Sequence, residues 1–292
     1  MRGMKRCAYL VMEDPGDYVT DYHVSFDAMA GLGWRVDCVP WRDRSVDWNL
    51  FDAVYICTPW DYPEDPELFM QVLEAIDASS ATLVNPLSLV QWTLAKTYLR
   101  DLAENGAAIV PSLWFDDFDE ALVPGWFETL HTDSVVIKPV VGANAQDTFV
   151  LTSPVDAGLV DELQRRFSER GFFVQPFMTN VLSEGEYSLF FFDGVYSHAI
   201  LKTPERGDFR TQEEHGADIR SIAATPEQVA AAEEILALVE PRPVYVRVDL
   251  MRDDNDSYLL MELELIEPSL YLRTDPGSPG RFARAFDAAV VG

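Results

Sequence analysis

Charged and apolar residues alternate in two segments near the C-terminal end of the sequence. The sequence reads YVRVDL around Arg247 and Asp249, and further along it reads MELEL around Glu262 and Glu264. Alternation at period two is typical of strands with one polar face, so each pair should point to one side of a sheet. Three carboxylates beside a guanidinium suit Mg²⁺, which proteins usually hold through a few carboxylates and substrate phosphates. An exposed strand face in an acidic protein is the alternative interpretation.

Two lysines occupy places from which they could bind phosphate. Lys138 ends the apolar segment VVIKP and precedes a loop of small residues, 142–145. Backbone N–H groups of such a loop could cover phosphates, although the loop lacks the Walker A pattern. Lys96 lies within a predicted amphipathic helix over residues 87–104. At both positions, a lysine that simply faces solvent is the alternative.

A proline interrupts the apolar segment FVQPFM, which contains Gln175, Phe177 and Met178. Proline has no N–H group and leaves nearby backbone groups unpaired, as a hinge that recognises adenine requires. Glu184 and Glu186 follow, and either could accept hydrogen bonds from ribose hydroxyls. An ordinary strand end before a solvated acidic loop is the alternative.

Two cations lie at the ends of neighbouring segments in a chain that has few of them. Lys202 ends the segment HAILK, and Arg210 follows in GDFR. They are natural partners for a phosphate or a substrate carboxylate. The same loop continues through Glu213 and His215. His215 could be a base, but a surface position is the alternative.

Three further residues are candidates for the substrate wall. Trp60 and Asp61 follow an apolar segment in the N-terminal part, and open α/β sheets bind ligands at the carboxyl ends of their strands. Ser269 lies in the segment 269–274 after the acidic strand. For the aromatic loop, packing on a neighbouring segment is the alternative.

The charge balance excludes some classes of partner. The chain has 292 residues, 49 of them acidic and 22 basic, for a net charge of −27. Nucleic-acid binders derive much of their affinity from Lys and Arg on phosphates, so this balance argues against nucleic acid and against an anionic membrane surface. No signal segment or long apolar span is visible, which predicts a cytoplasmic protein. The three cysteines, in apolar segments without CxxC spacing, are expected to be buried structural thiols.

The chain divides into two parts. In residues 1–86, apolar segments alternate with predicted helices, which is typical of an α/β domain with a parallel sheet. The expected strands are 6–12, 34–40 and 53–57, and the expected helices are 18–32 and 66–78. Residues 87–292 begin with the helix 87–104 and continue as an α+β body whose short strands favour antiparallel sheets. Its expected strands are 135–139, 148–151, 172–176, 187–192, 195–201, 245–251 and 258–266, and its two further helices are 156–170 and 226–239.

In chain order these features resemble the ATP-grasp superfamily of ligases, nearest to its bacterial glutathione synthetase and ribosomal S6 modification branch. The pattern runs Asn-Pro, a helix lysine, IKP with a loop of small residues, QPF, GEYS, a lysine and an arginine, RVD and then ELE. It covers roughly residues 85–270. The resemblance implies an ATP-grasp body of two subdomains that clasp ATP, with a small lid subdomain at about 111–177, behind the N-terminal α/β domain.

The resemblance also implies roles for the residues quoted above. The ATP-binding residues would be Lys96, Lys138, Gln175, Phe177, Met178 and Glu184, with the choice between Glu184 and Glu186 at the ribose left open. The metal ligands, for two Mg²⁺ ions or Mn²⁺ in their place, would be Asp249, Glu262 and Glu264. The residues that stabilise the transferred phosphoryl group and an acyl phosphate would be Arg247, Lys202 and Arg210. The substrate candidates would be Trp60, Asp61, Glu213, His215 and Ser269.

The chain departs from the family pattern at three places. Glu264 stands where the last metal ligand is often Asn, which adds negative charge. The loop 142–145 holds one glycine where relatives have several. The segment EPSLY at 267–271 replaces the small residues that usually follow in glutathione synthetases, so glutathione is not the expected product.

The implied function is an ATP-dependent ligase that joins a carboxylate to an amine on small amino-acid-type substrates. An acyl phosphate would be its intermediate, and ADP and phosphate its products. The segments WDY and ELELIEPSL also resemble the cyclo-ligases that close a cycloserine ring from an O-ureido amino acid, an antibiotic-forming reaction. A non-catalytic ATP sensor and a ligase acting on a protein terminus are further alternatives. The complete acidic set with Arg247 counts against the sensor, and the net charge gives no support to the protein acceptor. A homo-oligomer is compatible with all of these readings.

Overall fold

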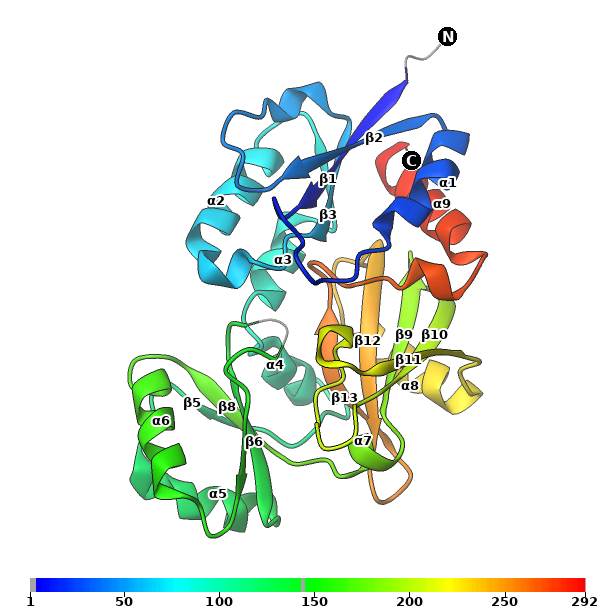
Figure 1. The fold of residues 1–292 in the computed structure, drawn as a ribbon. Helices are drawn as coiled ribbons and strands as arrows, with labels where there is room; N and C mark the ends of the chain where they lie inside the picture. The colour runs from blue at the N-terminus through cyan, green and yellow to red at the C-terminus, as the bar shows by residue number, and fades with distance from the viewer. Residues whose placement is uncertain (1–3, 143–144, 292) are drawn as a thin grey trace.

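The computed structural model describes residues 4–142 and 145–291, which form three parts, each built on its own sheet. Figure 1 shows the N-terminal sheet at the top, a central sheet below it and a small subdomain set to one side. Ala143 and Asn144, in the expected loop of small residues, lie outside the described residues.

The N-terminal part is a parallel sheet with helices on both faces, as predicted. Its strand order is β2-β1-β3-β4, and all of its pairings are parallel. Helices α2 and α3 lie on one side of the sheet, and α1 and α9 lie on the other (Figure 1). With both faces covered, β3 is buried along its whole length and reads as a continuous apolar run. The bounds are β1 Lys5–Val11, α1 Phe26–Gly31, β2 Trp34–Pro40, β3 Ala53–Thr58, α2 Pro66–Asp77 and β4 Thr82–Val84.

Two helices differ from the sequence prediction here. The helix expected over 18–32 begins as a 3₁₀ turn at Tyr22–Ser25 and continues as α1. The C-terminal helix α9, Ser278–Val291, was not predicted, because a proline and a glycine in its first turn read as a loop. It packs against α1 and β4 and also against β9 and β10. None of the helices in the described ranges is both long and apolar enough to cross a membrane.

The central part is an antiparallel sheet of order β11-β10-β9-β12-β13, again as predicted. The expected helix over 87–104 is two helices, because the chain bends at residues 94–97, where the Lys96 amide donates to the Val140 carbonyl at 2.7 Å. The bounds are α3 Leu87–Thr93, α4 Tyr98–Glu104, α7 Asn180–Ser183, β9 Glu186–Phe192, β10 Val195–Thr203, β11 Asp218–Ile222, α8 Pro226–Leu236, β12 Tyr245–Arg252 and β13 Tyr258–Glu264.

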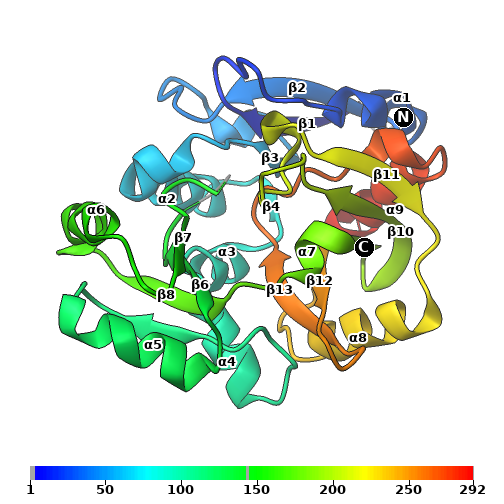
Figure 2. The same cartoon turned by 60° about the horizontal axis from the view of Figure 1, so that its bottom comes forward.

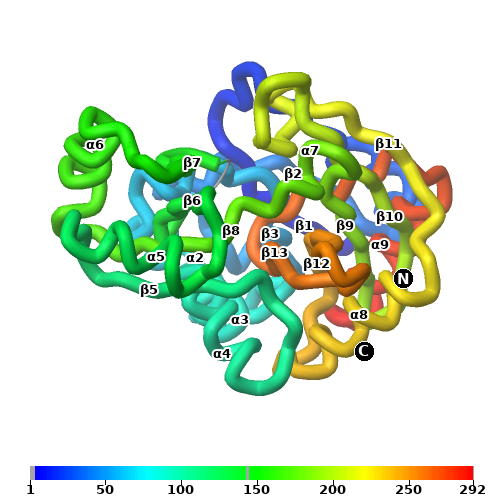
Figure 3. Tube along the Cα trace, turned by 90° about the horizontal axis from the view of Figure 1, so that it is seen from below, coloured from blue at the N-terminus to red at the C-terminus, as the bar shows by residue number. Residues whose placement is uncertain are grey.

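The small subdomain is an antiparallel sheet of order β5-β8-β6-β7, with helices α5 and α6 packed on it. In Figure 2 and Figure 3 it lies beside the central sheet rather than stacked on it. Its core, which includes Trp126, Phe167 and Phe172, is formed by its own side chains. The bounds are β5 Leu113–Phe115, α5 Val123–Leu130, β6 Ser134–Pro139, β7 Phe149–Thr152, α6 Ala157–Phe167 and β8 Phe172–Pro176.

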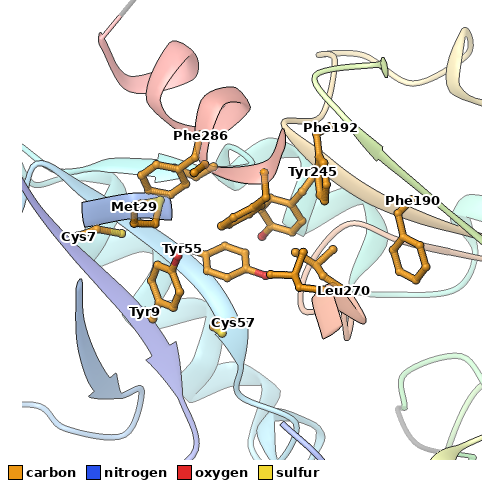
Figure 4. Close-up of a cluster of buried hydrophobic side chains, with 14 of the residues drawn as sticks. Cys7, Tyr9, Met29, Tyr55, Cys57, Phe190, Phe192, Tyr245, Leu270 and Phe286 are labelled. Carbon is orange, nitrogen blue, oxygen red and sulfur yellow. The ribbon is translucent and has the colours of Figure 1, made fainter. Parts of the chain in front are cut away.

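In contrast, the N-terminal and central parts share a hydrophobic cluster, beside the clusters within each of them. Tyr55 of β3 contacts Tyr245 of β12, with ring centroids 4.9 Å apart, and also Phe282 of α9. Figure 4 shows this cluster, in which Phe190, Phe192 and Tyr245 come from the central sheet, Tyr9 and Tyr55 from the N-terminal sheet and Phe286 from α9. The two parts predicted on either side of residue 86 therefore pack together through this cluster.

Two of the cysteines, Cys7 and Cys57, are buried in this shared cluster, as expected. Burial raises the pKa of both thiols well above its usual value, so they stay protonated. Cys38, on the edge strand β2, is exposed, contrary to the expectation.

A buried asparagine joins the two strands that carry the acidic residues. Asn85 has a left-handed backbone with φ of 60° and is fully buried. Its amide donates to the carbonyls of Tyr245 and Leu265 at 2.9 and 2.8 Å, and its oxygen accepts from the Val244 amide at 2.8 Å. Asn85 therefore ties the start of β12 to the end of β13, where the chain leaves the N-terminal part.

We expect Asn85→Ala to lower the free energy of unfolding by roughly 3 kcal/mol, because it leaves buried backbone groups without partners. Urea denaturation followed by circular dichroism would measure this change. Asn105→Ala is the control, since Asn105 is exposed and bonds only to the Asp101 carbonyl within the described contacts. Equal stability of the two variants would contradict the role of Asn85.

Candidate active site

A cavity of about 200 Å³ opens where the three parts of the chain meet. The small subdomain contributes Lys138 from β6 and Gln175 from β8, the central sheet contributes Asp249 and Glu262, and the N-terminal part contributes Trp60. The predicted site residues that line the cavity are Trp60, Lys96, Lys138, Gln175, Phe177, Met178, Lys202, Arg210, Arg247, Asp249, Glu262, Glu264 and Ser269.

The paired strands β12 and β13 place the predicted charged residues on one face. Arg247 lies opposite Glu264, and Asp249 lies opposite Glu262. The Arg247 guanidinium bonds to Asp249 at 2.9 Å and also forms an ion pair with Glu264. The register shifts after Asp249, so the alternation that sets this face ends there.

Lys202 extends the charged network to the neighbouring strands. Its buried ammonium pairs with Glu186 of β9 and lies 3.4 Å from Asp249. The hydroxyl of Ser188 donates to Asp249 at 2.5 Å. Burial alone would lower the pKa of Lys202, but Asp249 and Glu186 raise it above its usual value, so the ammonium stays charged. Although burial opposes ionisation of Asp249, Arg247 and Lys202 lower its pKa.

The two candidate phosphate-binding lysines differ in their partners. Lys96, in the bend between α3 and α4, forms an ion pair with Glu262. Lys138 has no ion pair within the described part of the chain, and its ammonium lies 3.1 Å from the Met261 sulfur. Burial lowers the pKa of Lys138, with Glu262 acting in the opposite direction. Lys138 therefore offers a desolvated positive charge to an incoming anion.

The carboxylates expected to bind metal are turned toward cations. In residues 4–142 and 145–291, no three His, Cys, Asp or Glu side chains form a ready metal cluster. Asp249, Glu262 and Glu264 each pair with a lysine or an arginine instead. Burial and the nearby Glu262 and Asp249 raise the pKa of Glu264 even though Arg247 lowers it, so negative charge here is only partly compensated. Such hard oxygen donors fit a divalent cation in their chemistry, and a cation could replace part of this pairing.

The segment expected to hold adenine lies at the opposite side of the cavity. Gln175 is buried, and its amide nitrogen donates to the Ser112 hydroxyl at 3.0 Å. Its carbonyl oxygen, Oε1, is buried and has no hydrogen-bond partner in the described structure. A buried acceptor without a donor is costly, so a ligand with an N–H group would be favoured there.

The structure does not bring four predicted residues to the cavity wall. Glu184 pairs with Arg252 outside it, whereas Glu186 lines it. The reason is Gly185, which has φ of +107° and interrupts the alternation just before β9. The expectation that Glu184 faces the ribose site therefore does not match this geometry.

The other three lie in the surrounding loops. Asp61 accepts from the indole of Trp41 at 2.6 Å and pairs with Arg42, so it supports the loop rather than the cavity. Glu213 pairs with Arg273, and His215 lies in the same short 3₁₀ turn; neither lines the cavity, although Glu214 between them does.

Two cavity residues were not predicted from the sequence, Tyr98 and Glu267, whereas Glu186 was one of the two ribose candidates and Tyr62 belongs to the predicted aromatic loop. The Tyr98 hydroxyl accepts from the Leu263 amide at 2.9 Å and so fixes α4 on β13. Glu267 follows the end of β13, where alternation no longer indicates direction.

A buried histidine holds the loop that follows β13. The His198 ring stacks on Phe190, and its Nε2–H donates to the Leu270 carbonyl at 3.0 Å, with the Ser197 hydroxyl donating to Nδ1. Burial lowers the pKa of His198 to about 4. Because Ser269 and Tyr271 on either side of Leu270 line the cavity, His198 positions part of its wall.

We expect His198 to destabilise the fold in acid. In the unfolded chain His198 takes up a proton below its ordinary pKa of about 6.5, whereas in the folded chain it does so only near pH 4. The free energy of unfolding therefore decreases as the pH is lowered from about 6.5 to about 4. This contribution amounts to about 2 kcal/mol between pH 7 and pH 5. Urea denaturation at both pH values should show a smaller loss for His198→Gln than for the unchanged protein. Equal losses would contradict the assignment.

Comparisons with known proteins agree with this geometry. A family model described as the N-terminal domain of D-cycloserine synthetase DcsG matches residues 7–85. The cycloserine biosynthesis protein DcsG of Streptomyces lavendulae is 32% identical over 285 residues, which cover 93% of this chain and 93% of that protein. The crystal structure of D-cycloserine synthetase DcsG has a TM-score of 0.86 and 29% identity, covering 98% of this chain and 99% of that one.

More distant structures share the fold. The RimK domain ATP-grasp protein of Sphaerobacter thermophilus has a TM-score of 0.68 at 13% identity, covering 98% of this chain and all of that one at 100%. The ATP-grasp ligase PsnB, solved with a precursor, Mg and ADP, has a TM-score of 0.66 at 14% identity over 98% of each chain. The predicted ATP-grasp fold and the resemblance to cycloserine-forming ligases are confirmed. The chain belongs to the family of the cycloserine biosynthesis protein DcsG and is an ATP-grasp ligase, an enzyme that forms a C–N bond.

Proposed function

We propose that the enzyme uses Mg-ATP to activate the carboxylate of a small amino acid as an acyl phosphate. A nitrogen of the same molecule then attacks the acyl carbon and displaces phosphate, which closes a cycloserine-type ring, and in an O-ureido substrate water removes the carbamoyl group as carbon dioxide and ammonia. The observation that carries the proposal is the charged face of β12 and β13 in the cavity, with Arg247, Asp249 and Lys202 in contact. The O-ureidoserine type of substrate is favoured over two separate substrates by the name of the relative with 32% identity.

The residues divide into an ATP side and a reaction side. Lys138 and Lys96 would bind the phosphates, and the unpaired Oε1 of Gln175 would accept from the adenine amino group. The neighbouring Phe177 and Met178 would line the base, and Glu186 rather than Glu184 lies on the cavity side for the ribose.

Asp249, Glu262 and Glu264 would hold two Mg²⁺ ions, the number expected from the sequence. Bound there, ATP would supply the phosphoryl group, and Mg²⁺ would neutralise the negative charge of its phosphates. Lys202 and Arg247 would stabilise the negative charge of the phosphoryl group and of the acyl phosphate during displacement. Arg210, on the cavity rim and paired with Asp208 at 2.6 Å, could exchange that partner for the same anion.

Release of ADP, measured with Mg-ATP and a panel of amino acids and O-substituted serines, tests the proposal. The panel includes O-ureidoserine, and its members are supplied singly and in pairs. Turnover with O-ureidoserine alone, with cycloserine detected by mass spectrometry, is the expected result. Turnover that requires two components would identify an intermolecular ligase instead. Binding of ATP without release for any member would contradict the proposed activity on these substrates.

A further inference from the structure

One carboxylate in the cavity wall lacks a cationic partner. Glu267 lines the cavity and is partly buried, yet it forms no ion pair within the described part of the chain. The other non-exposed carboxylates of the wall are paired: Glu186, Asp249, Glu262 and Glu264 each contact a lysine or an arginine. Lysines and arginines therefore compensate the negative charge of those other wall carboxylates, whereas that of Glu267 has no cationic partner among the described residues.

The backbone of Glu267 is held in place from both sides. The Trp60 indole donates to the Glu267 carbonyl at 2.9 Å, and the Tyr245 hydroxyl donates to the preceding Ile266 carbonyl at 2.8 Å. The Ser269 carbonyl accepts from Arg247 at 3.4 Å. A side chain on such a fixed segment is preorganised for a ligand and loses little freedom on binding.

The surroundings of Glu267 disfavour a negative charge on its carboxyl group. Burial and the nearby Glu264 and Glu262 raise its pKa to about 8, although Lys96 and a hydrogen bond from Tyr62 act in the opposite direction. A positive group brought by a ligand would reverse this penalty, because an opposite charge at short range favours the ionised carboxylate.

The surroundings of Glu267 suit an organic cation. Trp60 and Tyr62 line the same part of the wall, and aromatic rings attract ammonium groups. This part belongs to the N-terminal side, whereas Lys138, Gln175 and Met178 lie in or next to the small subdomain and carry the proposed ATP side. No ready metal cluster of His, Cys, Asp or Glu includes Glu267 in the residues that the structure describes.

We propose that Glu267 binds the α-ammonium group of the amino-acid substrate and that Tyr62 positions the carboxylate of Glu267. The proposal rests on the proposed function, since it takes the substrate to be an amino acid. It adds the residue by which the enzyme would distinguish an amino acid from a simple carboxylic acid of the same shape. The substrate carboxylate then points toward Arg247 and Lys202. Glu267 fixes the amino end of the substrate, and the two cations fix its carboxylate end.

The test compares two ligands and two proteins. O-ureido-D-serine and 3-(ureidooxy)propanoic acid differ in the α-ammonium group, and Glu267→Gln removes the negative charge at nearly constant shape. Calorimetry with Mg²⁺ and a non-hydrolysable ATP analogue measures binding without turnover. The unchanged protein should prefer the amino acid roughly 10- to 100-fold, the range for a charge-assisted hydrogen bond, and Glu267→Gln should reduce that preference to about threefold or less. Affinity for the ATP analogue should stay within about twofold.

Glu233→Gln is the matched control, because Glu233 is exposed on α8 and the substitution changes the net charge equally. It should keep the full preference. Tyr62→Phe is a second variant and should weaken binding of the amino acid about threefold.

Two outcomes would overturn the proposal, and they are distinguishable. Equal affinity of the unchanged protein for both compounds, or an undiminished preference in Glu267→Gln, would remove Glu267 from this role while ADP release with O-ureido-D-serine left the proposed function intact. Absence of both binding and ADP release with O-ureido-D-serine would reject the proposed function and this inference together.

Discussion

Replacing Asp249 with Asn should lower turnover by roughly a hundredfold or more. Asp249 contacts Arg247, Lys202 and Ser188, so two of the cavity's cations share this carboxylate. Loss of one preorganised electrostatic group typically costs this much in kcat. Glu262→Gln should have an effect of the same size, because Glu262 lies directly opposite Asp249 and pairs with Lys96. Steady-state release of ADP at saturating substrate measures both.

The control for this series is Asp254→Asn, in the exposed turn that joins the same two strands. It removes one carboxylate near the site without touching the cavity and should retain most of the activity. Near-normal turnover of Asp249→Asn, at a thermal midpoint close to that of the control, would refute the assignment of Asp249 to the metal.

Replacing Arg247 with Gln should cost both activity and stability. Its guanidinium is buried against Asp249 and Glu264, so the substitution leaves two carboxylates facing each other without it. Removal of one partner from a buried pair costs about 3 kcal/mol or more. The loss of a positive charge that would stabilise the acyl phosphate should lower kcat roughly a hundredfold. Urea denaturation and ADP release on the folded protein separate the two effects.

Arg252→Gln is a matched control on the same strand. Arg252 also pairs with a glutamate, Glu184, but that pair lies outside the cavity and is more exposed. Exposed ion pairs contribute up to about 1 kcal/mol, so this variant should be close to the unchanged protein in stability. Its activity should change by no more than a few fold. Similar losses in the two variants would mean that Arg247 acts through the fold alone.

The part of the site carried by β12 and β13 could be predicted because alternation is a local property. Arg247, Asp249, Glu262 and Glu264 face the same way through the period of a strand, and no distant contact is needed to orient them. The sequence also predicts which sheet is parallel and which are antiparallel. Long connections between apolar segments favour parallel pairing, and short connections favour antiparallel pairing.

Other placements depend on contacts between distant segments, which a single sequence does not reveal. The bend at Lys96 forms where its amide meets the Val140 carbonyl of another subdomain. The sequence does not distinguish Glu184 from Glu186 as the ribose candidate, whereas the positive φ of Gly185 turns the two side chains to different places. Glu267 faces the cavity because Trp60, far away in the sequence, holds its backbone.

The shared cluster of the N-terminal and central parts holds these two parts together, and the small subdomain joins the central core through Phe173 of β8. Rotation of the N-terminal sheet against the central sheet would expose Tyr55, Tyr245 and Phe282, at a large cost in buried apolar area. The small subdomain has its own core, and the chain enters it just after Val110, whose amide still pairs with Leu260 of β13. Trp60, Tyr62 and Glu267 therefore belong to a rigid frame, and the recognition of the substrate's amino end is separated mechanically from any movement that admits ATP.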